Sequence, residues 1–263
     1  MREAASTEKK YSGAKWSVLF FAGIIILWQI LIPLFGVPDY LMPTPWRVVE
    51  EFGKRGWVIL YHLVPTFEVT ILGFLIGAVV GIFSGIGIVY SHFLWLTVYP
   101  ALVLVSSVPR IAIAPLILIW FGIDSLLSKV IISFLVAFFP MLINSVVGLS
   151  QINPDMIDLG KTMGMSRLDE FKKLRLPNSV PFLFAGFKAS IALAVIGAVV
   201  AEFVSGERGL GYLIIVGFDD MNSSIVFASI VVLAAMSLGM FGILVWLEKV
   251  LMPWRQGIQI TEM

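Results

Sequence analysis

Long stretches with almost no charged residue dominate this sequence. Six of them recur along the chain, each long enough to cross about 30 Å of hydrocarbon as a helix. They cover residues 16–35, 64–90, 93–121, 129–149, 181–204 and 225–250. A bilayer offers backbone groups no hydrogen-bond partner, so only helices and closed barrels span it, and stretches of this length favour helices. We therefore predict an all-α integral membrane protein with six transmembrane helices.

The composition excludes several other classes. Hydrophobic residues make up 59% of the 263 residues and charged residues only 13%, about half the charged share of a soluble domain. A net charge of +1 provides no basic surface for nucleic acid. With no cysteine and only two histidines, which are far apart in the sequence, neither a thiolate nor a histidine-cluster metal site is expected. We expect membrane lipid around the protein, and neither a nucleic-acid partner, a bound metal nor catalytic residues.

The distribution of positive residues predicts the orientation. Of the 18 Lys and Arg residues, eleven fall on the side of the amino terminus and six on the other, and Lys188 lies within a span. Positive residues are retained in the cytoplasm, so both termini are expected there. The predicted parts are a cytoplasmic tail (1–15), one six-helix membrane domain (16–250) and a second cytoplasmic tail (251–263), and the largest cytoplasmic connection is 151–180. Lys188 is close enough to that side to extend its ammonium to the interface.

A glycine repeat marks one face of the second span. Gly73, Gly77, Gly81 and Gly85 recur every four residues and so share one side of a helix. Small residues at this spacing let another helix approach closely. We interpret the row as a helix-packing seam, and a seam along which helices move is the second interpretation.

Charged residues inside the spans are candidates for the translocation pathway, because they are costly at that depth. Glu68, Arg110 and Glu202 are such residues. Arg110 lies between Pro109 and Pro115, where the helix is expected to break and backbone groups can line a path. The guanidinium of Arg110 suits an anionic solute, since arginine binds oxyanions through two parallel hydrogen bonds.

The connection at 151–180 contains a segment similar to a phosphate-binding loop, Gly160-Lys161-Thr162. The first glycine of that motif stands five positions earlier, where this chain has Asp155, and no buried strand precedes it. We therefore expect no ATPase site in this chain.

The same connection resembles the cytoplasmic EAA motif in the permease subunits of bacterial ABC importers. That motif reads Glu-Ala-Ala, three residues, Gly, nine residues, Ile-x-Leu-Pro. The matching positions are Asp158-Leu159-Gly160, Gly164 and Leu174-Arg175-Leu176-Pro177. All three residues of the opening triplet differ from the motif and Leu174 replaces Ile, whereas Gly164 and Leu176-Pro177 agree with it.

The resemblance covers nearly the whole chain and is closest to the subfamily that imports nitrate, aliphatic sulfonates, taurine and related small solutes. Besides the loop, the matching segments are 41–45, 108–116 with 120–122, 139–140, 201–202 with 209–212, and 253–255.

This resemblance implies a type I ABC importer permease fold in the bacterial cytoplasmic (inner) membrane. Its implied partners are a separate ABC ATP-binding subunit, an extracytoplasmic solute-binding protein and a second copy of the permease in a homodimer. ATP and Mg²⁺ are then bound by the ATP-binding subunit, which leaves this chain a transport subunit without a cofactor and not an enzyme. The implied solute is a small anion such as sulfonate, taurine or nitrate, or a vitamin or pyrimidine precursor. The implied ATPase-coupling residues are Asp158, Leu159, Gly160, Gly164, Leu174, Leu176 and Pro177.

Other classes fit less well. An ion-coupled secondary transporter using Glu68 or Glu202 as proton carrier is the main alternative, although it should show paired broken helices. An intramembrane protease would need a base beside Ser84, and His62 and His92 lie at opposite ends of its span. A membrane scaffold does not account for the spacing of the 151–180 connection.

Overall fold

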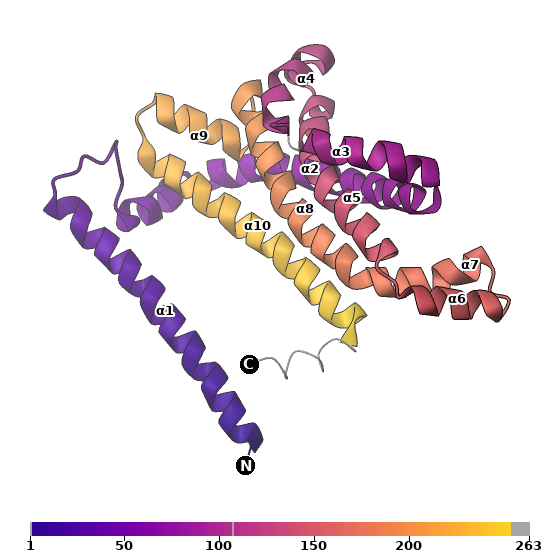
Figure 1. Ribbon diagram of the computed structural model, residues 1–263. Helices are drawn as coiled ribbons and strands as arrows, with labels where there is room; N and C mark the ends of the chain where they lie inside the picture. The colour runs from indigo at the N-terminus through magenta and orange to yellow at the C-terminus, as the bar shows by residue number, and fades with distance from the viewer. Residues whose placement is uncertain (1, 107, 254–263) are drawn as a thin grey trace. The chain divides into compact units, whose positions relative to one another are not determined.

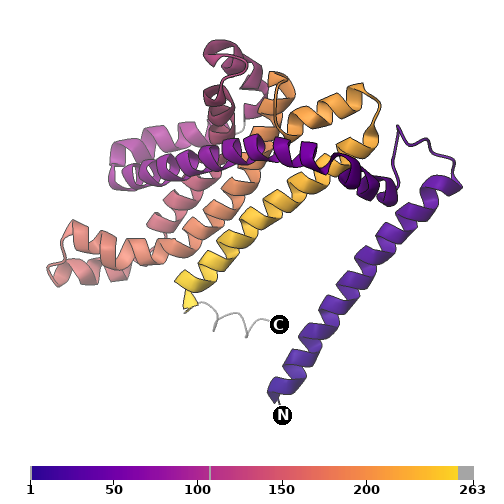
Figure 2. The ribbon, with the colours of Figure 1, turned by 180° about the vertical axis from the view of Figure 1, so that it is seen from behind.

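The computed structural model describes residues 2–106 and 108–253, and within them every regular element is a helix (Figures 1 and 2). The α-helices are α1 (Arg2–Leu34), α2 (Pro45–Tyr90), α3 (Tyr99–Ser106), α4 (Ala114–Phe121), α5 (Leu126–Ser150), α6 (Pro154–Thr162), α7 (Arg167–Glu170), α8 (Leu176–Ser205), α9 (Leu210–Asp219) and α10 (Ser223–Leu251). Two π-helical turns, Leu94–Val98 and Phe171–Arg175, and a 3₁₀ turn, Arg110–Ile113, join some of them. Of the expected C-terminal tail, residues 254–263 lie outside the described residues.

Among the described residues, five helices are long and apolar enough to cross a membrane. These segments are Trp16–Leu34, Pro45–Tyr90, Leu126–Ser150, Arg167–Ser205 and Ser223–Leu251. A sixth candidate is the pair Leu94–Ser106 and Arg110–Phe121, whose halves are bent by 84° relative to each other. The all-α membrane class is therefore confirmed, with five or six spans.

The chain divides into two compact units, Met1–Leu60 with Leu213–Val231, and Tyr61–Tyr212 with Val232–Met263. In the first unit the N–H of Trp46 donates to Oε1 of Gln29 at 3.0 Å, which ties the start of α2 to α1. The Ser223 hydroxyl donates to the carbonyl of Tyr40 and ties the start of α10 to the α1–α2 connection. From Trp16 to Leu34, α1 is mostly apolar and almost entirely exposed, as expected for a helix surrounded by lipid.

In the second unit the glycine face of α2 packs directly on α5. A Cβ placed on Gly77 would lie 3.2 Å from Ala137, one on Gly81 2.9 Å from Met141, and one on Gly85 2.6 Å from Ser145. A Cβ on Gly73 would collide with Ser133. The partners are themselves spaced by four, so two straight rows of residues meet. Only hydrogen fits in the space on the α2 side, which explains the glycines. Because α5 of the same chain covers this face, the repeat gives no support to a homodimer.

The other side of α5 is joined to α8 by reciprocal hydrogen bonds. Ser133 Oγ of α5 donates to the carbonyl of Ala194 at 3.0 Å, and Ser190 Oγ of α8 donates to the carbonyl of Ala137 at 2.7 Å. Both hydroxyls are fully buried, and interhelical bonds of this kind satisfy polar groups that lipid cannot. Together α2, α5 and α8 form the packed core of this unit, where α5 and α8 run side by side in both views (Figures 1 and 2).

Lys188 forms an ion pair that its position in the sequence did not predict. Its Nζ forms an ion pair with Oε2 of Glu248 at 2.7 Å, and both side chains are largely buried. The pairing offsets the cost of placing either charge in an apolar surrounding. It joins α8 to the last turns of α10.

The helix breaks where Pro109 and Pro115 predicted. Helix α3 ends at Ser106, a 3₁₀ turn covers Arg110–Ile113, and α4 begins at Ala114 with Pro115 in its first turn. Proline is tolerated in a first turn because its missing N–H has no intrahelical partner there.

Two alanine substitutions on α2 test the seam. In Gly85→Ala the new Cβ would lie 2.6 Å from Ser145 Cβ, so we expect a loss of about 1–3 kcal/mol in the free energy of unfolding. In Gly87→Ala the nearest atom is Leu94 Cδ1 at 3.8 Å, and the variant should be as stable as the parent or more stable by up to about 1 kcal/mol. Thermal unfolding in detergent, followed by tryptophan fluorescence, measures the difference. Equal midpoints for the two variants would contradict the packing described.

Candidate functional site

Residues 151–180 form a compact helical hairpin together with the first turn of α8, and we call this segment the 151–180 loop. Its first arm is α6, whose start is capped by Asn153, because the Asn153 side chain accepts the N–H of Asp155 at 2.9 Å. Pro154 occupies the first turn, where its missing N–H costs nothing. Asp155 near the start and Lys161 in the last turn complement the helix dipole.

Two glycines of the first arm have different structural roles. Gly164 has φ +76°, and its N–H donates to Lys161 O at 3.0 Å while the next N–H, of Met165, donates to Gly160 O at 2.9 Å. This pattern is a Schellman ending, which requires a left-handed residue at the position of Gly164. Gly160 instead is buried, and a Cβ there would lie 3.1 Å from Met165 Sδ. Of the two roles that a glycine can have, Gly164 provides the turn and Gly160 the close approach.

The second arm runs into the following span without a break. Ser166 caps α7 by accepting the N–H of Asp169 at 3.2 Å. The π turn Phe171–Arg175 then leads into α8, and the N–H of Leu176 donates to Phe171 O, five residues back. A widened turn leaves room for the ring of Pro177, which would clash with a carbonyl four residues back in a regular helix. The sequence motif ends in this proline, yet the helix continues through it from Arg167 to Ser205.

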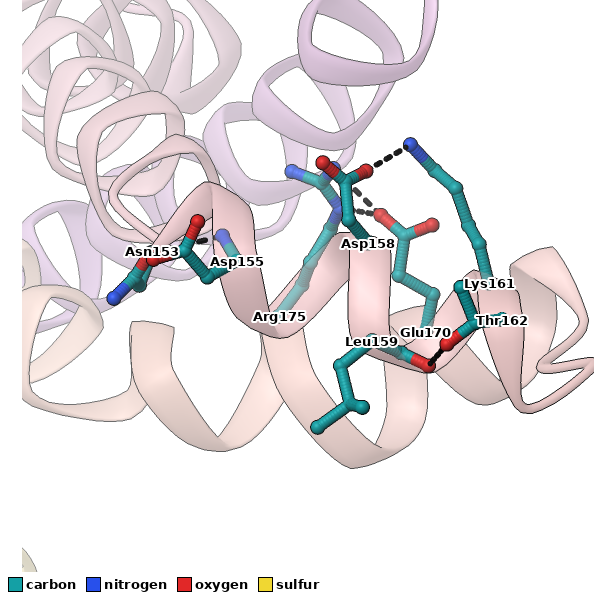
Figure 3. Close-up of polar contacts among 8 residues, drawn as sticks. All are labelled: Asn153, Asp155, Asp158, Leu159, Lys161, Thr162, Glu170 and Arg175. Atoms are coloured by element: carbon teal, nitrogen blue, oxygen red, sulfur yellow. Dashed lines mark hydrogen bonds and ion pairs between the residues drawn. The ribbon is translucent and has the colours of Figure 1, made fainter.

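Arg175 fastens the second arm to the end of α5. Its guanidinium pairs with Oε1 of Glu170 at 2.6 and 2.7 Å (Figure 3). Its Nη1 also donates to the carbonyl of Leu149 at 2.9 Å. The amide of Asn178 adds bonds to the carbonyls of Gly148 and Gln151 at 3.2 and 2.6 Å. The last carbonyls of a helix have no intrahelical partner, so these side chains satisfy the C-terminal end of α5.

The outer surface of the 151–180 loop carries exposed apolar side chains. Leu159 is 62% exposed and Met163 77% exposed. Leu159 points away from the Arg175–Glu170 pair (Figure 3). Met156 and Leu168 are also exposed on the two arms. Apolar side chains gathered on a polar connection are typical of a surface that binds another protein.

The other coupling residues implied by the sequence lie on the same hairpin. Asp158 is exposed and pairs with Lys161 at 2.9 Å. Leu174 is half-buried, Leu176 is 39% exposed, and Pro177 lies in the first turn of α8. All seven residues therefore lie on the hairpin or in the first turn of α8, within the second unit.

The candidate pathway residues are in three different surroundings. Glu68 is exposed on the surface of α2. Nη2 of Arg110 donates to the carbonyl of Ser106 at 2.7 Å, and the guanidinium lies over the ring of Phe139 at 4.5 Å. Glu202 is 1% exposed and binds Thr66 and the N–H of Gly211. Among the described residues, no hydrogen bond or ion pair joins Glu68, Arg110 and Glu202 to one another.

Residues 58–252 match the protein family described as the binding-protein-dependent transport system inner membrane component. The chain belongs to this family. It is a permease subunit of an ABC importer and a multi-pass protein of the inner membrane. The resemblance found in the 151–180 loop is thus confirmed for the chain as a whole.

Three relatives cover most of the chain. The formylaminopyrimidine transport permease protein of Halalkalibacterium halodurans is 32% identical over 90% of this chain and 95% of its own length. The riboflavin transport system permease protein of Chloroflexus aurantiacus is 30% identical over 88% of this chain and 87% of its own. The nitrate import permease protein of Leptolyngbya laminosa is 32% identical over 87% of this chain and 82% of its own. These names describe transport subunits, and they do not favour a secondary carrier.

The EAA motif leaves the position of Arg175 unspecified, yet this residue anchors the second arm to α5. Arg175→Met would leave the Glu170 carboxylate and the Leu149 carbonyl without their partner, so we expect the 151–180 loop to be destabilised by about 2 kcal/mol. Lys173→Met on the same arm removes a solvent-exposed pair with Asp169 and should change nothing measurable. Amide hydrogen exchange of residues 149–165 in nanodiscs measures both. Equal exchange in the two variants would refute the anchoring role.

Proposed function

We propose that this chain forms the translocation pathway of an ATP-driven importer and that a separate ATP-binding subunit docks on its 151–180 loop. The observation that carries the proposal is the combination of a fastened hairpin with an exposed apolar surface. Leu159 is presented to solvent on an arm that ends in the Gly164 turn, while Arg175 and Asn178 bind the second arm to α5. A partner that moves this hairpin would move α5 and α8 with it, because a packed, hydrogen-bonded core transmits displacement.

The assembly that we propose has two copies of this chain, two ATP-binding subunits and a solute-binding protein on the opposite side of the membrane. Both termini and the 151–180 loop then face the cytoplasm, as the distribution of Lys and Arg predicted. ATP and Mg²⁺ belong to the partner subunit. Family membership supports this assembly, and the homodimer has no separate support from the α2 glycine row.

The docking surface is tested by one apolar and one charged position of α6. Leu159→Asp should weaken binding of the ATP-binding subunit at least about tenfold, because a charge replaces an apolar anchor at a desolvated contact. Lys161→Gln, which removes an exposed ion pair two residues away, should leave binding unchanged. The measurement is affinity between purified permease and ATP-binding subunit in detergent, after co-purification from the native membrane identifies that subunit. Normal binding by Leu159→Asp would exclude this surface, and a native preparation without any ATP-binding subunit would exclude the importer assembly.

For the solute we propose a small anion, such as a sulfonate, taurine or nitrate. Arg110 supports this choice, because its charge is permanent, it lies at the interrupted helix between α3 and α4, and it forms no ion pair among the described residues. Among the described residues, one of its five donors is bound to the protein, through the carbonyl of Ser106. The relatives named for formylaminopyrimidine and riboflavin keep a vitamin or pyrimidine precursor as the second candidate.

Uptake by Arg110 variants separates these solutes. Arg110→Gln should lower uptake of labelled nitrate or taurine at least about tenfold, because a charge-assisted bond is lost, whereas Arg110→Lys should retain part of it. Membrane levels of each variant provide the control. Unchanged uptake by Arg110→Gln would remove Arg110 from the pathway. Uptake that resists ATP depletion but stops with a protonophore would instead favour the secondary transporter with Glu68 or Glu202.

A further inference from the structure

The end of α8 opposite the 151–180 loop holds a buried polar cluster made by His62, Thr66 and Glu202. Three consecutive backbone N–H groups bind to three side-chain acceptors there. Gly209 N–H donates to His62 Nδ1 at 3.2 Å, Leu210 N–H to Thr66 Oγ1 at 2.8 Å, and Gly211 N–H to Glu202 Oε2 at 2.9 Å. The Thr66 hydroxyl itself lies 3.0 Å from Oε2 of Glu202. These are the N–H groups that the start of α9 leaves without intrahelical partners.

Glycine is required for this approach. Gly209 has φ +116°, and a Cβ on it would collide with the carboxyl group of Glu202. A Cβ on Gly211 would lie 2.8 Å from Val199 O. The Gly209-Leu210-Gly211 sequence therefore lets backbone N–H groups reach a carboxylate that is 1% exposed. Two acceptors come from α2 and one from α8, so the cluster joins these helices to the turn that follows α8.

The same turn presents two charges outward. Gly206, with φ +68°, ends α8, and the side chains of Glu207 and Arg208 are exposed beyond it. Neither side chain forms an ion pair within the described part of the chain. Helix α8 has 30 residues and is thus about 45 Å long, so this tip and the 151–180 loop lie at opposite ends of it.

We propose that Glu202 and Thr66 are positioning residues that hold the Glu207–Arg208 tip rigid, as a contact for the solute-binding protein. Such a partner would offer a basic group to Glu207 and an acidic group to Arg208. This inference rests on the proposed importer function. Because the tip is fixed to both α2 and α8, a partner that displaces the tip on one side of the membrane also displaces the hairpin at the other end of α8. A tip held only by its own backbone would absorb that contact by local motion.

Two threonines of α2 provide a matched pair for the test. Thr66 and Thr70 are both fully buried and one helical turn apart, but the Thr70 hydroxyl has no hydrogen-bond partner among the described residues. The chain has no cysteine, so Glu207→Cys gives a single site for a spin label. In nanodiscs, Thr66→Val should shorten the rotational correlation time of this label about threefold, because local motion is released, and Thr70→Val should not. Equal label mobility in both valine variants would overturn the positioning role without involving any partner.

The second measurement uses the assembled transporter and its binding protein loaded with solute, both recovered by co-purification. We expect Thr66→Val to lower the ratio of stimulated to basal ATPase rate about fivefold, from the loss of hydrogen bonds that fix the tip, and Thr70→Val to leave it unchanged. Glu202→Gln should keep part of the stimulation, since its amide oxygen can accept the Gly211 N–H. Arg208→Glu should weaken the same stimulation, because it reverses a contact charge. If the parent shows stimulation and Thr66→Val matches it, this inference fails alone. If the parent shows none, the proposed importer function fails.

Discussion

Backbone groups at helix ends need partners, and in this protein other helices provide them. At one end of α8, Arg175 and Asn178 bind the last carbonyls of α5. At the other end, His62, Thr66 and Glu202 bind the first N–H groups of α9. A membrane cannot satisfy such groups and an apolar core leaves them costly, so each cluster fixes the position of a chain reversal. The α5–α8 hairpin and the turn between α8 and α9 are therefore as well defined as the helices that they connect.

Between these two ends, small residues set the distances. The α2 glycines admit α5 so closely that a methyl group would not fit at Gly81 or Gly85. On the opposite side, Gly197 of α8 lies against the backbone of α5 at Ser133. Association of helices in lipid depends on such close contact, because apolar side chains gain little by leaving a lipid for each other. The core of three helices is thus held by shape and by a few hydroxyl groups.

The sequence predicted the class, the approximate spans, the helix break at Pro109 and the seam of glycines, because hydropathy, proline and glycine act locally. It did not predict what Arg175 binds, since the carbonyl of Leu149 lies 26 residues away and a carbonyl leaves no trace in the sequence. Glu202 was recognised as a costly buried acid, but its partner Thr66 is 136 residues distant. The ion pair of Lys188 was not predicted, because its partner Glu248 follows 60 residues later in the sequence.

The π turn before Pro177 sets how α7 is rotated relative to α8 within the continuous helix Arg167–Ser205. It inserts the equivalent of one extra residue, which rotates everything after it by roughly 100° about the helix axis relative to an uninterrupted helix. The face that Leu168 presents to solvent and the face that α8 buries against α5 therefore follow different phases of the helical repeat. A deletion of one residue in this turn would remove this offset, and the second arm could no longer keep both its bonds to the end of α5 and the packing of α8.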